Sequence, residues 1–349
     1  MKKYMALLAL VLLIGLSASY ARKKPAMYGV GFYNLENLFD TCHDAGKNDY
    51  DFLPDGSYRW TSEKYTHKLR NLARVLAEMG TDKLPDVGCA AIGVAEVENA
   101  ACLTDLCKQT PLKARNFKYV HIEGPDKRGI DCALLYNPKL FTVRNVKLVP
   151  YVYVQPIDEK YLTRGFLTVS GTMAGEHVTI IVCHLPSRAA TSYYREEGGR
   201  QLRELKDSLM RDDPGVKLLI MGDMNDDPHD KSMAESLGAK RKKEDVEAPD
   251  GLWNPWWDVL ASGTGTLKYK GAWNLFDQII VSHSLLDQQG KAGDKSLKLV
   301  DYQIVSRDYL FQKDGKWAGY PLRTHSGGEW LDGYSDHLPT VVYLAKTKK

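Results

Sequence analysis

The chain contains more strand-like segments than helix-like ones, and several of the strands follow one another directly. Short apolar or β-branched runs predict strands at residues 26–33, 86–97, 117–122, 130–136, 143–154, 165–171, 177–183, 218–221, 275–281 and 338–344. Helical spacing of apolar residues predicts helices at 61–79, 99–108 and 193–210, and residues 41–60 and 301–334 are predicted to be loops. This order excludes a simple alternation of strand and helix. It indicates an α/β fold of antiparallel or mixed sheets flanked by a few helices.

One predicted strand ends in a cluster of carboxylate and amide side chains. The apolar run Leu218-Leu219-Ile220-Met221 is followed by Gly222-Asp223-Met224-Asn225-Asp226-Asp227-Pro228, which reads as the loop that leaves the strand. A buried strand that delivers such oxygens at its end suits a hard cation such as Mg²⁺. Taken alone, the same residues also fit a solvated acidic turn.

Comparable polar groups stand near the ends of five other predicted strands. They are Asn34 with Glu36, Glu96, His184, Asp277, and Asp336 with His337. Each has an ordinary structural reading, as a turn cap, a salt-bridge partner or a structural histidine. A carboxylate at the end of a buried strand is nevertheless costly unless it is paired or bound to a cation. Because two packed sheets can bring such strand ends together, the groups jointly predict one site.

The order of these groups resembles that of the endonuclease/exonuclease/phosphatase superfamily, which includes DNase-I-like nucleases, neutral sphingomyelinases and inositol polyphosphate phosphatases. The resemblance covers essentially the whole chain after its first segment. It rests on Tyr33-Asn34, Ala95-Glu96, Gly222-Asp223-Met224-Asn225, Phe276-Asp277 and Ser335-Asp336-His337. The segments 34–40 and 186–188 look most like secreted members from Bacteroidetes-type bacteria. The resemblance implies a four-layer α/β sandwich, with two packed, mainly antiparallel β-sheets flanked by helices, and residues 22–349 as a single domain.

The resemblance also implies catalytic roles. His337 would activate or orient the attacking water, and Asp277 would fix the tautomer of its ring. Asp223 and Asn225 would position the water or the phosphate, and some accounts of the family make this aspartate the base instead. His184 would donate a hydrogen bond or a proton at the scissile phosphate.

Two further sets of residues follow from the resemblance. A divalent cation, Mg²⁺ or Mn²⁺, would neutralise phosphate oxygens. Its expected ligands are Glu96 together with Asn34, Glu36 or Asp336. The expected phosphate-binding residues are Ser187 and Arg188, with Arg128 and Arg164 as weaker candidates at the rim. Asp131 interrupts an apolar strand, and Arg128 is its candidate partner.

The expected activity is metal-dependent hydrolysis of a phosphodiester, with a nuclease as the leading hypothesis. The alternative is an esterase similar to sphingomyelinases or inositol polyphosphate phosphatases. For a lipid substrate, Trp253, Trp256 and Trp257 would supply an exposed apolar loop; they could equally stack on a substrate or cover a sheet edge. A non-catalytic binding module on the same fold is a third reading, and the retained Asp277 and His337 argue against it.

The first 21 residues predict a secretory signal, because a basic start is followed by an apolar run and small residues around Tyr20; a retained membrane anchor is the alternative. Its removal lowers the formal net charge from +3 to +1, so nucleic acid would be bound locally rather than through bulk charge. The protein is expected to be a periplasmic or secreted monomer without a transmembrane segment. Cys89, Cys132 and Cys183 lie in apolar runs and are expected to be buried, with at most one disulfide among the six cysteines.

Overall fold

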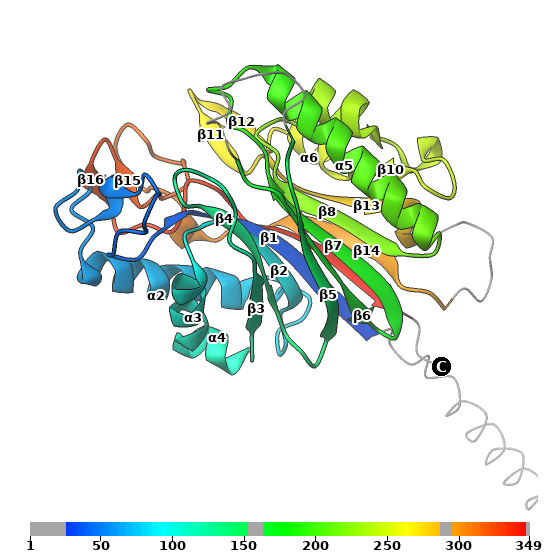
Figure 1. Ribbon diagram of the computed structural model, residues 1–349, viewed down its shortest axis with the longest axis horizontal. Coiled ribbons are helices and arrows are strands. Elements are labelled where there is room, and N and C mark those ends of the chain that lie inside the picture. Colours follow the sequence, from blue (N-terminus) through cyan, green and yellow to red (C-terminus); the bar gives the residue numbers. More distant parts are fainter. Residues whose placement is uncertain (1–25, 153–162, 287–294, 347–349) are drawn as a thin grey trace, which may run out of the picture.

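Two β-sheets packed face to face form the centre of the protein, and helices cover their outer faces (Figure 1). The computed structural model describes residues 26–152, 163–286 and 295–346. The expected signal, residues 1–21, lies outside this range. The architecture is the four-layer α/β sandwich that the sequence resemblance implied.

The first sheet has six strands in the order β14-β17-β1-β2-β4-β3. All neighbours are antiparallel except β1 and β2. In sheet order the strands are β14 (Lys298–Ile304), β17 (Thr340–Lys346), β1 (Ala26–Leu38), β2 (Cys89–Val97), β4 (Asp131–Tyr136) and β3 (Lys118–His121).

The second sheet has seven strands in the order β5-β6-β7-β8-β13-β10-β9. Only the pairs β7–β8 and β10–β9 are parallel, so this sheet is also mainly antiparallel. In sheet order the strands are β5 (Phe141–Val149), β6 (Phe166–Met173), β7 (Glu176–His184), β8 (Lys217–Asp223), β13 (Asp277–Ser282), β10 (Leu252–Trp253) and β9 (Ala239–Lys240).

Three helices cover the outer face of the first sheet and one long helix covers the second (Figure 1). The first group is α2 (Ser62–Glu78), α3 (Ala100–Lys108) and α4 (Thr110–Ala114); the second sheet carries α5 (Ser192–Asp212) and a π-helical turn (Ser232–Leu237). The N-cap of α2 is Thr61, whose side chain accepts a hydrogen bond from the Lys64 N–H. Apolar residues of α2 and α5 recur at helical spacing, and their burial against the sheets stabilises both outer layers.

The central core lies between the sheets and is formed by strand residues from both, such as Phe32, Leu134, Ile180 and Ile279. Gly93 of β2 permits their close approach, because a Cβ at this position would lie 2.6 Å from Met221 Sδ of β8. The absence of a side chain at Gly93 therefore lets the two sheets lie close together where β2 crosses β8. The ends of these strands carry the site described below.

Short hairpins and helices lie at the rim of the sandwich. Two hairpins are built from β11 (Leu267–Tyr269) with β12 (Ala272–Asn274), and from β15 (His325–Ser326) with β16 (Glu329–Trp330). The helix α6 (Trp256–Ala261) and 3₁₀ turns at Tyr50–Phe52, Lys243–Asp245, His283–Leu285 and Asp308–Leu310 complete the described elements. Within the three described ranges, none of the helices is both long enough and apolar enough to span a membrane.

The structure corrects the sequence prediction in three regions. The strand expected at residues 143–154 is β5, which ends at Val149, and residues 153 and 154 lie outside the described range. Residues 301–334 are not all loop, because β14 and the β15–β16 hairpin lie in or overlap this range. As a partly exposed edge strand with the sequence Lys-Leu-Val-Asp-Tyr-Gln-Ile, β14 has no regular apolar alternation. Trp253 and Trp256 do not form an exposed loop: they lie in β10 and α6, are 5% and 0% exposed, and pack on Tyr302. Cys89, Cys132 and Cys183 are buried as predicted, and all six cysteines are free thiols.

Candidate active site

Three of the expected catalytic groups form one row across the second sheet. His184 of β7 is the partner of Asp223 in β8, and Asp223 is the partner of Asp277 in β13. Position 222, just before Asp223, requires glycine, because a Cβ there would lie 2.0 Å from the Cys183 carbonyl oxygen of the neighbouring strand. The Gly-Asp pair thus lets β8 lie tightly against β7 while it delivers a carboxylate at the strand end.

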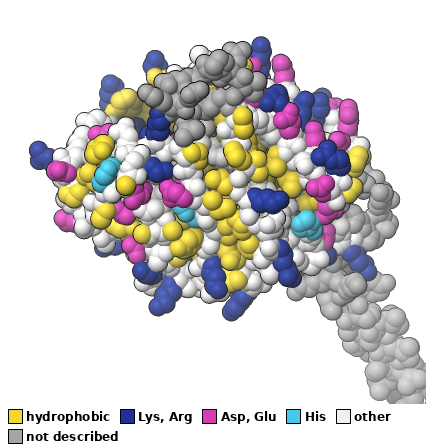
Figure 2. Space-filling model, in the orientation of Figure 1, with side chains coloured by type: hydrophobic (Ala, Val, Ile, Leu, Met, Phe, Trp, Pro, Cys, Tyr) yellow, Lys and Arg dark blue, Asp and Glu magenta, His cyan; other side chains and the backbone are white. Residues whose placement is uncertain are grey.

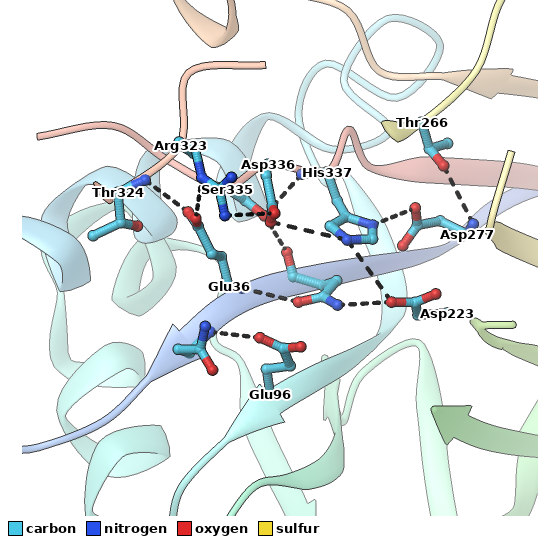
Figure 3. A network of polar contacts seen from close by, with 12 residues as sticks. Glu36, Glu96, Asp223, Thr266, Asp277, Arg323, Thr324, Ser335, Asp336 and His337 are labelled. Carbon is cyan, nitrogen blue, oxygen red and sulfur yellow. Dashed lines mark hydrogen bonds and ion pairs between the residues drawn. The ribbon is translucent and has the colours of Figure 1, made fainter. Parts of the chain in front are cut away.

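The first sheet contributes a distorted segment at the end of β1. The pairing of β1 with β2 is interrupted between Asn34 and Leu38, and the intervening Glu36 and Asn37 have φ values of 50° and 56°. Glu96 of β2 has a φ of 63°. Left-handed backbone is unfavourable for such residues and concentrates at functional sites. Here it lets the Asn37 N–H donate to Glu96 Oε2 at 2.9 Å (Figure 3).

Asp223 joins the two sheets. Its Oδ2 accepts a 3.0 Å hydrogen bond from Asn34 Nδ2 and lies 3.6 Å from His184 Nε2, while its Oδ1 accepts from the Asn225 N–H. Asn225 also donates from Nδ2 to the Leu185 carbonyl oxygen, so it supports the loop. Burial raises the pKa of Asp223 to about 7; His337 opposes this rise and Asp277 adds to it. A carboxylate with this pKa is able to exchange a proton near neutral pH.

His337 and Asp277 form a buried acid–base pair (Figure 3). His337 Nδ1 lies 2.7 Å from Asp277 Oδ2, which leaves Nε2 facing Asp223 and Asp336 at 3.8 and 3.9 Å. Burial alone would lower the pKa of His337, but the Asp277 and Asp223 carboxylates outweigh it and hold the pKa well above the ordinary value. With Nδ1–H donated to Asp277, a neutral His337 presents Nε2 as a proton acceptor.

His184 has the opposite electrostatic environment. Burial, followed by the charges of Arg164 and Arg128, holds the pKa of His184 well below its ordinary value. The ring is therefore neutral at physiological pH. Its Nε2 lies 3.9 Å from Glu96 Oε1 and faces Asp223, so it is suited to donate a hydrogen bond rather than a proton.

Glu96 and Asp336 are the residues best placed for a divalent cation. Both line a cavity of about 390 Å³ together with His184, Asp223 and His337. Each carboxylate is fixed by one oxygen: Glu96 Oε2 accepts from the Asn37 N–H and Asp336 Oδ2 from Arg323 Nη2. Carboxylate oxygens suit Mg²⁺ or Mn²⁺, so this donor set fits such an ion.

The other two expected ligands have different surroundings. Asn34 Oδ1 accepts a hydrogen bond from the Glu36 N–H, and its Nδ2 donates to Asp223. Asn34 therefore lies beside the cavity and fixes the position of Asp223, which lines it. Glu36 lies away from the cavity. Its oxygens accept from Arg323 Nε at 3.0 Å and from the Thr324 N–H at 2.7 Å (Figure 3).

Lys68 is a part of this network that the sequence reasoning missed. It is completely buried, with its Nζ 2.5 Å from Thr324 Oγ1, 2.7 Å from the Tyr334 carbonyl oxygen and 3.9 Å from Glu36 Oε2. Burial lowers its pKa to about 8, against the pull of Glu36. The sequence did contain a signal for its burial. Lys68 lies three residues after Tyr65 and four before Leu72, so it falls on the buried face of α2.

The same cavity is also lined by a positively charged wall. Lys127, Arg128, Arg164 and Ser187 line it. Asp126, not singled out from the sequence, organises the wall: its Oδ2 accepts from Arg164 Nη1 at 2.9 Å and its Oδ1 from the Arg128 N–H. Asp126 thus fixes the backbone at Arg128 and the buried Arg164 side chain, while the Lys127 and Arg128 side chains are exposed.

Arg188 is not brought into this cavity. Its guanidinium bonds Asp227 at 3.0 Å and Asp230 at 2.8 Å, and it stacks 4.4 Å from the Phe276 ring centroid. These contacts lie in a separate hollow lined by Arg188 and Arg195. The expected pairing of Arg128 with Asp131 is also absent from the contacts of Asp131, which accepts from His121 and the Gly124 N–H.

Comparisons with known proteins identify the family of the chain. The sequence matches the model of the "Endonuclease/Exonuclease/phosphatase family" over residues 29–346. No curated protein sequence matches the chain significantly. Similar solved structures include a family protein from Bacteroides thetaiotaomicron, at 15% identity and a TM-score of 0.54, covering 93% of this chain and 99% of that one.

Two further similar structures have named activities or ligands. A mannosyl-6-phosphatase of B. thetaiotaomicron has 15% identity and a TM-score of 0.53, with 91% of this chain and 99% of that chain covered. TDP2 of D. rerio, solved with a single-strand DNA product, has 14% identity and a TM-score of 0.53, with the same coverage. At these identities the structures show a shared fold, whereas the family match spans nearly the whole sequence. The chain belongs to the endonuclease/exonuclease/phosphatase family.

Proposed function

We propose that the protein is an exported, Mg²⁺- or Mn²⁺-dependent phosphodiesterase that acts as a nuclease. The observation that carries the proposal is the His337–Asp277 pair, which lies in one cavity with two anchored carboxylates, Glu96 and Asp336, and a wall of cations. A binding module would have no need for a buried histidine whose ring is oriented by an aspartate.

The residues of the cavity suit in-line hydrolysis of a phosphate ester. Arg128 and Arg164 attract the phosphate, and a cation held by Glu96 and Asp336 would supply charge neutralisation at its oxygens. A water oxygen forms the new bond to phosphorus and gives its proton to His337 Nε2. The bond from phosphorus to the leaving oxygen breaks, and that oxygen takes up a proton from solvent water. His184 donates a hydrogen bond that stabilises the developing negative charge.

The shape of the site supports a diester substrate. The catalytic cavity shares Leu267 and Asp336 with a second cavity, so a substrate has room to extend beyond the reacting phosphate. On the face shown in Figure 2, side chains of both charge signs are interspersed around the periphery, which agrees with local rather than bulk attraction of a polyanion. The D. rerio neighbour with its single-strand DNA product supports nucleic acid as the class.

The lipid alternative has less support. Trp253 and Trp256 are buried, so they do not offer the apolar docking surface that such an enzyme would use. Export rests on the leader at residues 1–21, which would place the mature protein in the periplasm or outside the cell.

The test is hydrolysis by the mature chain with Mg²⁺, with Mn²⁺ and with EDTA. The panel contains plasmid DNA, single-stranded RNA, sphingomyelin, an inositol polyphosphate and mannose 6-phosphate, each compared with His337→Ala. We expect metal-dependent cleavage of nucleic acid that His337→Ala abolishes. Cleavage of another member of the panel would replace the nuclease assignment, and activity that survives His337→Ala would overturn the catalytic assignment.

A further inference from the structure

A second cavity of about 390 Å³ opens directly beside the catalytic histidine. It lies between the β11–β12 hairpin and the segment 311–326, and it shares Leu267 and Asp336 with the catalytic cavity. Leu267 forms a β-bridge with His337, and the Leu338 N–H donates to the Thr266 carbonyl oxygen at 2.8 Å. The hairpin is therefore tied to the strand end that carries His337, and the two cavities are neighbours that share part of their lining.

Aromatic rings that face solvent line this second cavity. Tyr269 at the hairpin turn is 62% exposed and Trp317 is 40% exposed. Both belong to the few large hydrophobic side chains that are exposed in the described part of the chain. Exposed rings gathered at a cavity, rather than scattered, mark a binding surface.

Cations are interleaved with these rings. Lys268 Nζ lies 5.0 Å from the Tyr320 ring centroid, and Lys270 Nζ lies 5.3 Å from that of Tyr269. The one carboxylate in the lining, Asp336, is bonded to Arg323. The cavity therefore combines ring faces with net positive charge.

The backbone holds these rings in place before any ligand binds. The Gln312 N–H donates to the Tyr320 carbonyl oxygen at 2.9 Å, and the Gly319 N–H donates to Gln312 at 2.8 Å. These bonds close the loop whose tip carries Trp317. A platform that is already formed loses little conformational entropy on binding.

We propose that this second cavity binds an unpaired nucleotide next to the scissile phosphate, with its base on Tyr269, Trp317 or Tyr320 and its phosphate on Lys268 and Lys270. The inference rests on the proposed function. Bases stack on aromatic side chains whatever their identity, and lysines follow the backbone phosphates. A base in a duplex is already stacked and paired, so the subsite selects single-stranded DNA or RNA.

Kinetic comparison of two substrates tests the subsite. The first is a labelled twelve-nucleotide single strand, as DNA and as RNA; the second is methyl 4-nitrophenyl phosphate, which has no nucleotide to place there. We expect Tyr269→Ala and Trp317→Ala each to lower kcat/KM on the single strand about 5- to 100-fold, mainly through KM. Their activity on the small diester should stay within about twofold of wild type, because neither residue lines the catalytic cavity.

Matched controls separate stacking from other effects. Tyr50→Ala removes a tyrosine that is 57% exposed and lies outside both cavities, and it should change neither activity. Lys270→Gln should reduce the slope of log affinity against log salt by roughly 0.7. A duplex of the same sequence should be cleaved at least about tenfold less well than the single strand.

Three results would overturn the proposal: equal losses on both substrates, no loss on the single strand, or equal cleavage of strand and duplex. Fluorescence anisotropy of the labelled strand in EDTA keeps the test independent of catalysis. One outcome is that the wild type binds the strand in EDTA, with weaker binding by Trp317→Ala, and yet does not cleave the strand when Mg²⁺ is added. In that case the subsite stands while the proposed nuclease function fails. If the wild type binds no strand, the subsite is refuted as well.

Discussion

Replacing Asp277 by Asn tests the acid–base pair with almost no change of shape. Asp277 is completely buried, and its Oδ2 lies 2.7 Å from His337 Nδ1. At an effective dielectric constant of about 20, a charge pair at this separation is worth about 6 kcal/mol. An asparagine oxygen retains a neutral hydrogen bond of about 1 kcal/mol. The remaining loss, about 5 kcal/mol of transition-state stabilisation, corresponds to a fall in kcat of about 10³- to 10⁴-fold.

The pH dependence identifies which form of His337 is required. Asp277 is the largest influence that raises the pKa of His337, so Asp277→Asn lowers that pKa. If neutral His337 is the base, the acid limb of the kcat profile lies above the ordinary histidine value in the wild type and moves to lower pH in the variant. A shift of the alkaline limb instead would show that the charged ring is needed and would transfer the role of base to Asp223.

The assay is single-turnover hydrolysis of a phosphodiester at saturating Mg²⁺ over a range of pH. Mn²⁺ affinity and thermal unfolding are measured on the same samples. The Mn²⁺ affinity should be unchanged, because neither Glu96 nor Asp336 is altered. The matched control is Asp49→Asn, which changes another buried aspartate paired with a histidine, His43, outside the cavity. Less than a tenfold loss with no shift of either limb, or an equal loss in Asp49→Asn, would refute the reasoning.

Three other predictions concern cation binding, phosphate binding and stability. Glu96→Gln should weaken Mn²⁺ binding, measured by calorimetry, at least about tenfold while the melting temperature is retained; unchanged affinity would exclude this carboxylate as a ligand. Arg128→Ala should raise KM, because Arg128 lines the catalytic cavity. Arg188→Ala should leave KM unchanged, because Arg188 bonds Asp227 outside the cavity. It should instead lower the free energy of unfolding by about 1 kcal/mol in a denaturant titration. Burial lowers the pKa of His325 to about 4, so below its ordinary pKa the unfolded chain binds the proton more readily than the folded chain. Wild-type stability should therefore fall by about 2 kcal/mol from pH 6.5 to 4, and His325→Phe should reduce this dependence.

The buried ion network behind the site explains why β1 tolerates its distorted end. Glu36, in left-handed backbone, accepts hydrogen bonds from Arg323 and the Thr324 N–H, and Lys68 stands nearby. These contacts offset the strain and fix the segment between Asn34 and the Asn37 N–H that holds Glu96. A position expected from the resemblance to bind the cation thus acts, in this structure, as a support for the residues beside it.

Local sequence was sufficient for the long buried strands, the main helices and the polar groups at strand ends. Apolar runs reveal buried strands because each buried side chain must be apolar, and an acid or histidine at the end of such a run stands out against it. That is why Glu96, His184, Asp223, Asp277 and His337 could be named before the structure. In the structure these residues line or adjoin one cavity. The edge strand β14 escaped because it is only partly buried, so its sequence carries little of that pattern.

Only the tertiary structure decided which of these polar groups face the cavity and which face each other. Glu36 and Arg188 carry the same kinds of groups as Glu96 and Arg128, but Glu36 bonds Arg323 and Arg188 bonds Asp227. Their partners lie 287 and 39 residues away, and such pairings depend on how the sheets and rim loops meet rather than on neighbouring residues. The sequence thus indicates the type and order of the reacting groups. The direction of each side chain, and the second cavity beside His337, arise from long-range packing that no local pattern records.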